Sequence, residues 1–201
     1  MKYSCVLGID LAGVPHRPTG LCFLKNMEAR TFLLYTDKEI LDCAEREKPD
    51  LVAIDAPLNL PPGRNSIEDR TNSHYRPCDL ELRARKIPFF PITLGPMRKL
   101  TARGIILKEE LEKLNLRTAE IYPGGAQDIW GIPRAKKSLS ALRKGLQKLG
   151  ITGLKQDSSD HELDAATGAL VGHLFLLKKA EVLGNFSQGA ILMPYKEEER
   201  T

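Results

Sequence analysis

The sequence predicts an α/β fold in which a central mixed sheet of five strands is flanked by helices. Two short apolar runs, at residues 6–9 and 51–54, each end at an aspartate and indicate strands that are buried on both faces of a sheet. Three segments, at 38–48, 100–114 and 138–149, carry helical patterns, and a capping box predicts a further helix over 159–180. Helices that alternate with buried strands are typical of α/β architecture.

The first half of the chain predicts a meander followed by a crossover helix. The strand at 6–9 is followed by two further apolar runs at 19–24 and 31–35, with a polar connection between them. The helix at 38–48 stops at a proline that directly follows it. We expect this helix to carry the chain to the fourth strand, at 51–54, which then lies parallel to the first.

A proline-rich segment divides the predicted domain. Seven prolines fall within residues 57–98 and interrupt both helical and strand patterns, so we interpret this segment as an irregular functional insertion. The insertion belongs to a single predicted domain of residues 1–195. After it, the sequence predicts a helix over 100–114 and the fifth strand over 118–122. The charged segment 196–201 is expected to be a disordered tail.

Composition and charge exclude several classes of protein. A chain of 201 residues with 42% hydrophobic content can bury a core without disulfides or a structural metal. The longest apolar run, at 169–177, is too short to span a membrane, and the four cysteines lack paired spacing, so we expect a cytoplasmic protein. Residues 61–155 carry 19 basic and 9 acidic groups between two acidic ends. This distribution suits a metal with a phosphate-rich ligand, but charge counts alone favour the simpler explanation of solvated surface charge.

Three aspartates occupy positions at the edges of apolar segments. Asp10 and Asp55 end the first and fourth strands, and Asp164 lies inside the apolar last helix. A carboxylate at the edge of a core is costly unless a cation or hydrogen bonds compensate its charge. Three of them together therefore predict a site for Mg²⁺ or Mn²⁺, which prefer oxygen ligands. Taken singly, a strand-end aspartate more often serves only to form a turn.

The last helix is expected to lie close against the sheet. An S-x-x-E capping box opens it, and Gly168 and Gly172 lie on the same helical face as two aspartates. Small residues on that face allow close packing on strands. Either Asp160 or Asp164 could therefore reach the other carboxylates, and we favour Asp164 because Asp160 lies in the first turn, where it would interact with the helix dipole.

The segments around these aspartates resemble the carboxylate-bearing elements of the ribonuclease H-like superfamily. The resemblance rests on GIDLAG, VAIDAPL and HELDAATGAL. Together with CDLELR, LTARG and EIYPGGA, they resemble an uncharacterised domain family of predicted nucleases of RNase H fold. The resemblance implies a ribonuclease H-like fold with a RuvC-like arrangement in which Asp10, Asp55 and Asp164 bind metal, and Glu120 is a candidate fourth catalytic residue. One departure is Asp55, since resolvases commonly carry glutamate there.

The same resemblance implies a nuclease that hydrolyses phosphodiester bonds of nucleic acid with two divalent ions. Arginines of the insertion and of the following helix are candidates to bind substrate phosphates: Arg83, Arg85, Arg98 and Arg103. Two other functions remain open. One is a small-molecule phosphotransferase or nucleotide hydrolase of related fold, and the other is a nucleic-acid-binding protein without catalytic activity. The sequence does not distinguish a DNA, RNA or hybrid substrate, and it leaves the oligomeric state open.

Overall fold

Three antiparallel strands and one parallel strand form the first part of the sheet. The computed structural model describes residues 4–196. In it, β1 (Cys5–Asp10), β2 (Thr19–Lys25) and β3 (Glu28–Leu34) make the predicted meander. Next along the chain, β4 (Leu51–Asp55) pairs in parallel with β1. The sequence-based expectation for this half of the fold is therefore confirmed.

Three further strands extend the sheet beyond β4. β5 (Thr118–Ile121) is parallel to β4, β7 (Gly189–Pro194) is parallel to β5, and β6 (Ala180–Asn185) closes the edge antiparallel to β7. The strand order is β3-β2-β1-β4-β5-β7-β6, so the prediction of a five-stranded sheet was wrong. The two strands that were not predicted, β6 and β7, form a short hairpin. Its place in the sheet depends on the pairing of β7 with the distant β5, and a local sequence pattern does not indicate such a pairing.

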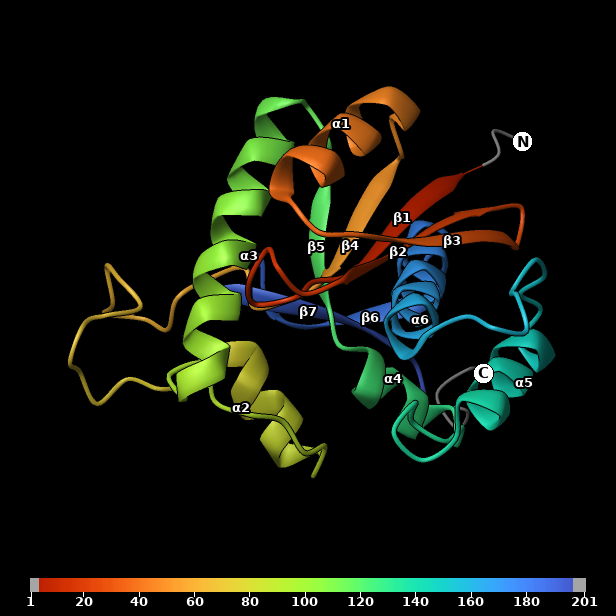
Figure 1. Ribbon diagram of the computed structural model, residues 1–201. Helices are drawn as coiled ribbons and strands as arrows, with labels where there is room; N and C mark the ends of the chain where they lie inside the picture. Colours follow the sequence, from red (N-terminus) through yellow and green to blue (C-terminus); the bar gives the residue numbers. More distant parts are fainter. Residues whose placement is uncertain (1–3, 197–201) are drawn as a thin grey trace.

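Helices cover both faces of this sheet (Figure 1). On one face, α1 (Asp37–Glu47) packs beside α3 (Gly95–Lys113). On the other face, α6 (Asp160–Leu176) crosses the strands, with α4 (Pro123–Ile129) and α5 (Leu139–Lys148) packed against it. The sheet is therefore the middle layer of a three-layer α/β structure, as the alternation of helices and strands predicted.

The proline-rich insertion contains regular structure that was not predicted. α2 (Pro77–Ala84) begins with a proline at its first helical position, where the missing N–H has no partner to lose. α3 likewise starts at Gly95 with Pro96 in its first turn, five residues before the predicted start. Between these elements and β4, the buried Arg64 guanidinium donates hydrogen bonds to three backbone carbonyls of the loop. The insertion is thus partly helical and internally bonded.

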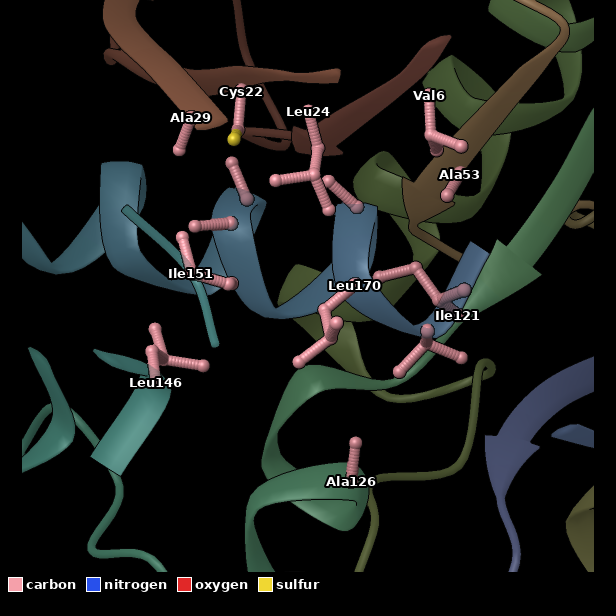
Figure 2. Close-up of a cluster of buried hydrophobic side chains, with 14 of the residues drawn as sticks. Val6, Cys22, Leu24, Ala29, Ala53, Ile121, Ala126, Leu146, Ile151 and Leu170 are labelled. Atoms are coloured by element: carbon pink, nitrogen blue, oxygen red, sulfur yellow. The ribbon is translucent and has the colours of Figure 1, made fainter. Parts of the chain in front are cut away.

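Two hydrophobic cores flank the sheet, and the alternation along each strand decides which core a residue enters. Val6 of β1 and Ala53 of β4 belong to the core beneath α6 (Figure 2), and both lie next to Gly172 of that helix. Ile9 and Ile54, at positions of the opposite parity, belong to the core beneath α1 and α3. Even-numbered positions of β1 and odd-numbered positions of β4 therefore face α6.

Glycines allow α6 to lie unusually close to the strands. A Cβ atom at Gly8 or Gly20 of the sheet would lie 2.0 Å from a backbone carbonyl oxygen of α6. On the helix, a Cβ atom at Gly168 or Gly172 would lie 2.7 or 2.8 Å from side-chain carbons of the sheet. The prediction that these helix glycines permit close packing is confirmed. Close packing matters because α6 carries the third aspartate.

The start of α6 is fixed as the capping box predicted. The Ser159 hydroxyl accepts a hydrogen bond from the Glu162 N–H, and the Glu162 carboxylate accepts one from the Ser159 N–H. The Thr31 hydroxyl of β3 donates to the same carboxylate at 2.9 Å. These bonds join the start of α6 to the meander, and they fix the position of its first turns relative to β3.

Two other expectations concern the chain ends and membranes. The predicted disordered tail at 196–201 lies outside the described residues, apart from its first residue. Within the described part of the chain, no helix combines the length and the hydropathy that crossing a membrane requires.

Candidate active site

Two carboxylates meet at the end of the parallel strands β1 and β4. The register of these strands places Asp10 directly opposite Asp55. Both side chains point toward α6, because the preceding residues Ile9 and Ile54 face the other core. The structure thus brings two predicted site residues together on one face of the sheet.

Asp164 approaches this pair from α6. Its side chain is partly buried, and burial, followed by the charge of Asp10, raises its pKa to about 6. Burial also raises the pKa of Asp55 well above its usual range, and the charges of Asp10 and Asp164 act in the same direction. The charge of Asp10 acts on both Asp55 and Asp164, and the charge of Asp164 acts on Asp55, so the three side chains lie near one another.

Two polar side chains hold the outer members of this acidic group. His161 Nδ1 lies 2.6 Å from Asp10 Oδ2, and this hydrogen bond raises the pKa of His161. Gln127 Nε2 donates to Asp164 Oδ1 at 2.7 Å. Neither residue was predicted as part of the site. His161 could have been suspected because it stands three residues before Asp164, on the same side of the helix, whereas Gln127 lies in α4, a helix that was not predicted.

The charge of the acidic group is poorly compensated. In the part of the chain that the structure describes, the ion pair between His161 and Asp10 is the only one that the three aspartates make. Burial and the neighbouring charges of Asp10, Asp164 and Glu120 all raise the pKa of Asp55, and no ion pair within 4–196 offsets its charge. Asp160 is exposed at the start of α6 and adds further negative charge, which raises the pKa of Asp164.

The chemistry of these side chains suits a hard divalent cation. Carboxylate oxygens are the ligands that Mg²⁺ and Mn²⁺ prefer, and here the charge of three carboxylates is poorly compensated. As the side chains stand, no three His, Cys, Asp or Glu residues within 4–196 are close enough to form a complete metal-binding group. The donor atoms fit such an ion, and the carboxylates would have to move closer to bind it.

Glu120, the candidate fourth catalytic residue, points away from the three aspartates. Its neighbours Ala119 and Ile121 face the α6 core, so Glu120 enters the opposite face of the sheet. Arg76 donates to its two oxygens at 2.6 and 2.8 Å, and the Leu58 N–H donates at 2.9 Å. Burial raises the pKa of Glu120, while Arg76 acts in the opposite direction. In this structure its carboxylate fixes the turn that follows β4.

Arg103, one of the four predicted phosphate ligands, is built into the protein. Its side chain is 7% exposed. The guanidinium donates to the carbonyls of Ala12 and Tyr35 at 2.6 and 2.8 Å, and it pairs with Asp37 at 2.8 Å. Arg103 therefore anchors the loop after β1, which continues from Asp10.

The other three arginines are spread over the surface, and the structure does not bring the four together. Arg85 forms a two-pronged ion pair with a glutamate of β6, at 2.5 and 2.8 Å. Arg98 pairs with the exposed Glu68 of the insertion. Arg83 is exposed and lies over the ring of Tyr75, 5.8 Å from its centre. Each guanidinium thus already has a partner on the protein, and only the partner of Arg83 is uncharged.

Among known proteins, similarity was found to solved structures only at the level of the fold. No protein-family model and no curated protein matches the chain. RuvC from Thermus thermophilus shares 13% identity over 87% of this chain and 96% of its own, with a TM-score of 0.47. T. thermophilus RuvC in complex with a Holliday junction substrate shares 18% identity over 86% of this chain and 94% of its own, with a TM-score of 0.45. Membership of the nuclease family that the motifs resemble therefore stays a prediction.

Proposed function

We propose that this protein is a metal-dependent nuclease that hydrolyses phosphodiester bonds, with Asp10, Asp55 and Asp164 as the ligands of Mg²⁺ or Mn²⁺. One observation carries the proposal: three carboxylates converge at one strand edge, and among the described residues only His161 offsets their charge. Mutual repulsion of this kind lowers stability, so a fold retains it where a ligand supplies the missing positive charge. The sheet and α6 position the carboxylates, and the bound ions would complete the site.

Each side chain of the site has a distinct task in this proposal. Asp10 and Asp55 are held at neighbouring strand ends, and Gln127 orients one oxygen of Asp164. When bound, divalent ions supply an activated water and stabilise the leaving oxygen of the phosphodiester. His161 Nδ1 shares a proton with Asp10 Oδ2, so this imidazole partly neutralises the acidic group while no ion is bound.

Of the four predicted phosphate ligands, Arg83 and Arg98 suit that role best. Arg83 has no carboxylate partner among the described residues, and the partner of Arg98 is an exposed glutamate that substrate could displace. Arg85 and Arg103 already hold structural contacts that phosphate would have to break. We therefore leave these two out of the proposed substrate contacts.

A nucleotide hydrolase is the second candidate function. The observation that favours it is a cavity of about 190 Å³ that has Asp55 in its wall and is large enough for a single base. Such an enzyme would act on mononucleotides and leave polymers intact. A protein that binds nucleic acid without cleaving it is the third outcome to test.

A cleavage assay separates these functions. The purified protein is incubated with labelled single-stranded, duplex, hybrid and branched DNA and RNA, and with mononucleotides, in Mg²⁺, Mn²⁺ or chelator. We expect metal-dependent cleavage of a polymer that Asp55→Asn reduces by about a thousandfold, a loss typical of a residue that contacts the reacting groups. Asp157→Asn, which removes an exposed carboxylate from the loop before α6, is the matched control and keeps the activity. Hydrolysis of mononucleotides alone, or binding without cleavage in either metal, would refute the proposal.

A further inference from the structure

A cavity with an aromatic rim opens beside Asp55. Its volume is about 190 Å³, its wall is largely apolar, and Phe89, Phe90 and Tyr122 contribute rings to it. Phe90 is 72% exposed, so its ring is accessible to a ligand that enters the cavity. The cavity is large enough for one planar ring system, and a base pair would not fit.

The rim of this cavity is anchored to the protein. The Tyr122 hydroxyl donates to the Pro88 carbonyl at 2.6 Å, and Phe89 packs edge-to-face with Tyr75, with ring centres 6.2 Å apart. Phe90 directly follows these fixed residues. The backbone that carries Phe90 is therefore fixed beside the cavity that this residue lines.

A second cavity, of about 600 Å³, lies between the loop after β1 and the start of α3. Its wall contains His16, Arg17 and Lys99, and no aspartate or glutamate lines it. Arg17 and Lys99 are exposed, and neither has a carboxylate partner among residues 4–196. This cavity therefore offers uncompensated positive charge, in contrast to the site around Asp55.

The two cavities share one wall. Met97 and Leu100, in the first turns of α3, line both of them. A largely apolar cavity with an aromatic rim therefore adjoins a cationic cleft across one turn of α3. The polar residues in the wall of the first cavity are Asp55 and the ion-paired Arg76, Asp79 and Glu120. Nucleic acid has the complementary chemistry, because its bases are planar and apolar on their faces while its backbone is anionic.

We propose that an unpaired nucleic-acid strand crosses the first turn of α3, with its phosphates beside Arg17 and Lys99 and one base stacked on Phe90 in the cavity next to Asp55. This inference rests on the proposed nuclease function and specifies its substrate as single-stranded. A base in a duplex would have to leave its stack to enter the cavity, which costs binding energy that an unpaired strand does not lose.

Binding in chelator tests this inference separately from cleavage. The fluorescence anisotropy of a short labelled strand, as DNA and as RNA, is compared with that of its duplex. We expect at least one of the two single strands to bind more tightly than its duplex, and Phe90→Ala to weaken that binding by about tenfold. Phe186→Ala removes a comparably exposed ring from the β6–β7 turn and is the matched control without effect.

The salt dependence tests the cationic cleft. Arg17→Gln and Lys99→Gln should each reduce the slope of log K against log salt by about 0.7 for a single strand, while Lys148→Gln on the exposed side of α5 leaves it unchanged.

Three outcomes would overturn the inference. They are tighter binding of the duplex, unchanged binding of the strand by Phe90→Ala, and equal affinity for a mononucleotide. Cleavage of a polymer together with duplex preference would refute it and leave the nuclease proposal intact. Phe90-dependent binding of a single strand without metal-dependent cleavage would support the inference and refute the nuclease proposal.

Discussion

Two groups of buried acids lie on opposite faces of the same sheet, and only one is neutralised. Glu120 and Asp79 pair with Arg76 at 2.6 and 2.8 Å, and all three side chains are at most 5% exposed. On the α6 face, the aspartates of the candidate site have only His161 as a cation among the described residues. The difference shows which acids maintain the fold and which are available to a ligand, since a buried carboxylate with its own arginine needs no other cation.

Replacing the arginine of the neutralised group should have the largest effect on stability. Arg76→Met leaves Glu120 and Asp79 buried without a cation, so we expect the free energy of unfolding to fall by about 3–5 kcal/mol. Asp55→Asn removes a carboxylate that has no cation partner among the described residues, and it should leave stability in chelator unchanged or higher. Urea denaturation of both variants measures the contrast. Equal losses in the two variants would mean that both acidic groups are structural.

The pH dependence of stability should identify the uncompensated group. The pKa of Asp164 is about 6 in the folded protein, above its ordinary value of 3.8, so the folded state binds this proton more tightly than the unfolded chain. Between these pH values the free energy of unfolding must therefore fall as the pH rises. From about pH 4 to pH 7, we expect the contribution of Asp164 to that fall to reach at most about 3 kcal/mol.

Comparison with Asp164→Asn isolates this effect from other titrating groups. The variant should lose less stability than the unmutated protein between pH 4 and pH 7. Part of the pH dependence should remain, because the pKa of Asp55 and that of His161 are also raised, and each stabilises the folded state at low pH. Identical pH profiles for the two proteins would show that Asp164 does not titrate as the structure indicates.

Metal binding should distinguish the two acidic groups by a smaller amount. At about ten times its Kd, Mg²⁺ should stabilise the unmutated protein by about 1.4 kcal/mol through mass action. Asp10→Asn should lose most of that increment. Glu120→Gln should retain it, although the variant starts from lower stability, because Glu120 lies on the other face with Arg76. Thermal melting with and without Mg²⁺ measures both, and loss of the increment in Glu120→Gln would restore Glu120 as a metal ligand.

The smallest expected effect concerns the amide that orients Asp164. Gln127→Met keeps most of the side-chain volume but removes the hydrogen bond to Asp164, so we expect a loss of about 1 kcal/mol at neutral pH. The same bond lowers the pKa of Asp164, so its removal should move the titration to higher pH. NMR titration of the Asp164 carboxyl group measures this shift. A shift to lower pH would contradict the proposed contact.

Local sequence patterns determined much of the frame of this protein. The apolar runs that end at Asp10 and Asp55 predicted two buried strands, and the helix between them predicted their parallel pairing. These features follow from periodicity, because the side chains that enter a core recur at fixed spacing along one element. The capping box and the glycines of α6 were readable for the same reason, since their effect depends on nearby residues.

Tertiary structure alone decided the partners of the polar side chains. Glu120 meets Arg76, which is 44 residues away in sequence, and Arg103 meets the carbonyl of Ala12, which is 91 residues away. No periodicity links such pairs, so the sequence presented Glu120 as a candidate ligand and Arg103 as a candidate phosphate contact. The missed β6–β7 hairpin has the same cause, because its place depends on pairing with a distant strand. Charge compensation is a property of the assembled fold, and only the fold showed that Asp55 lacks it.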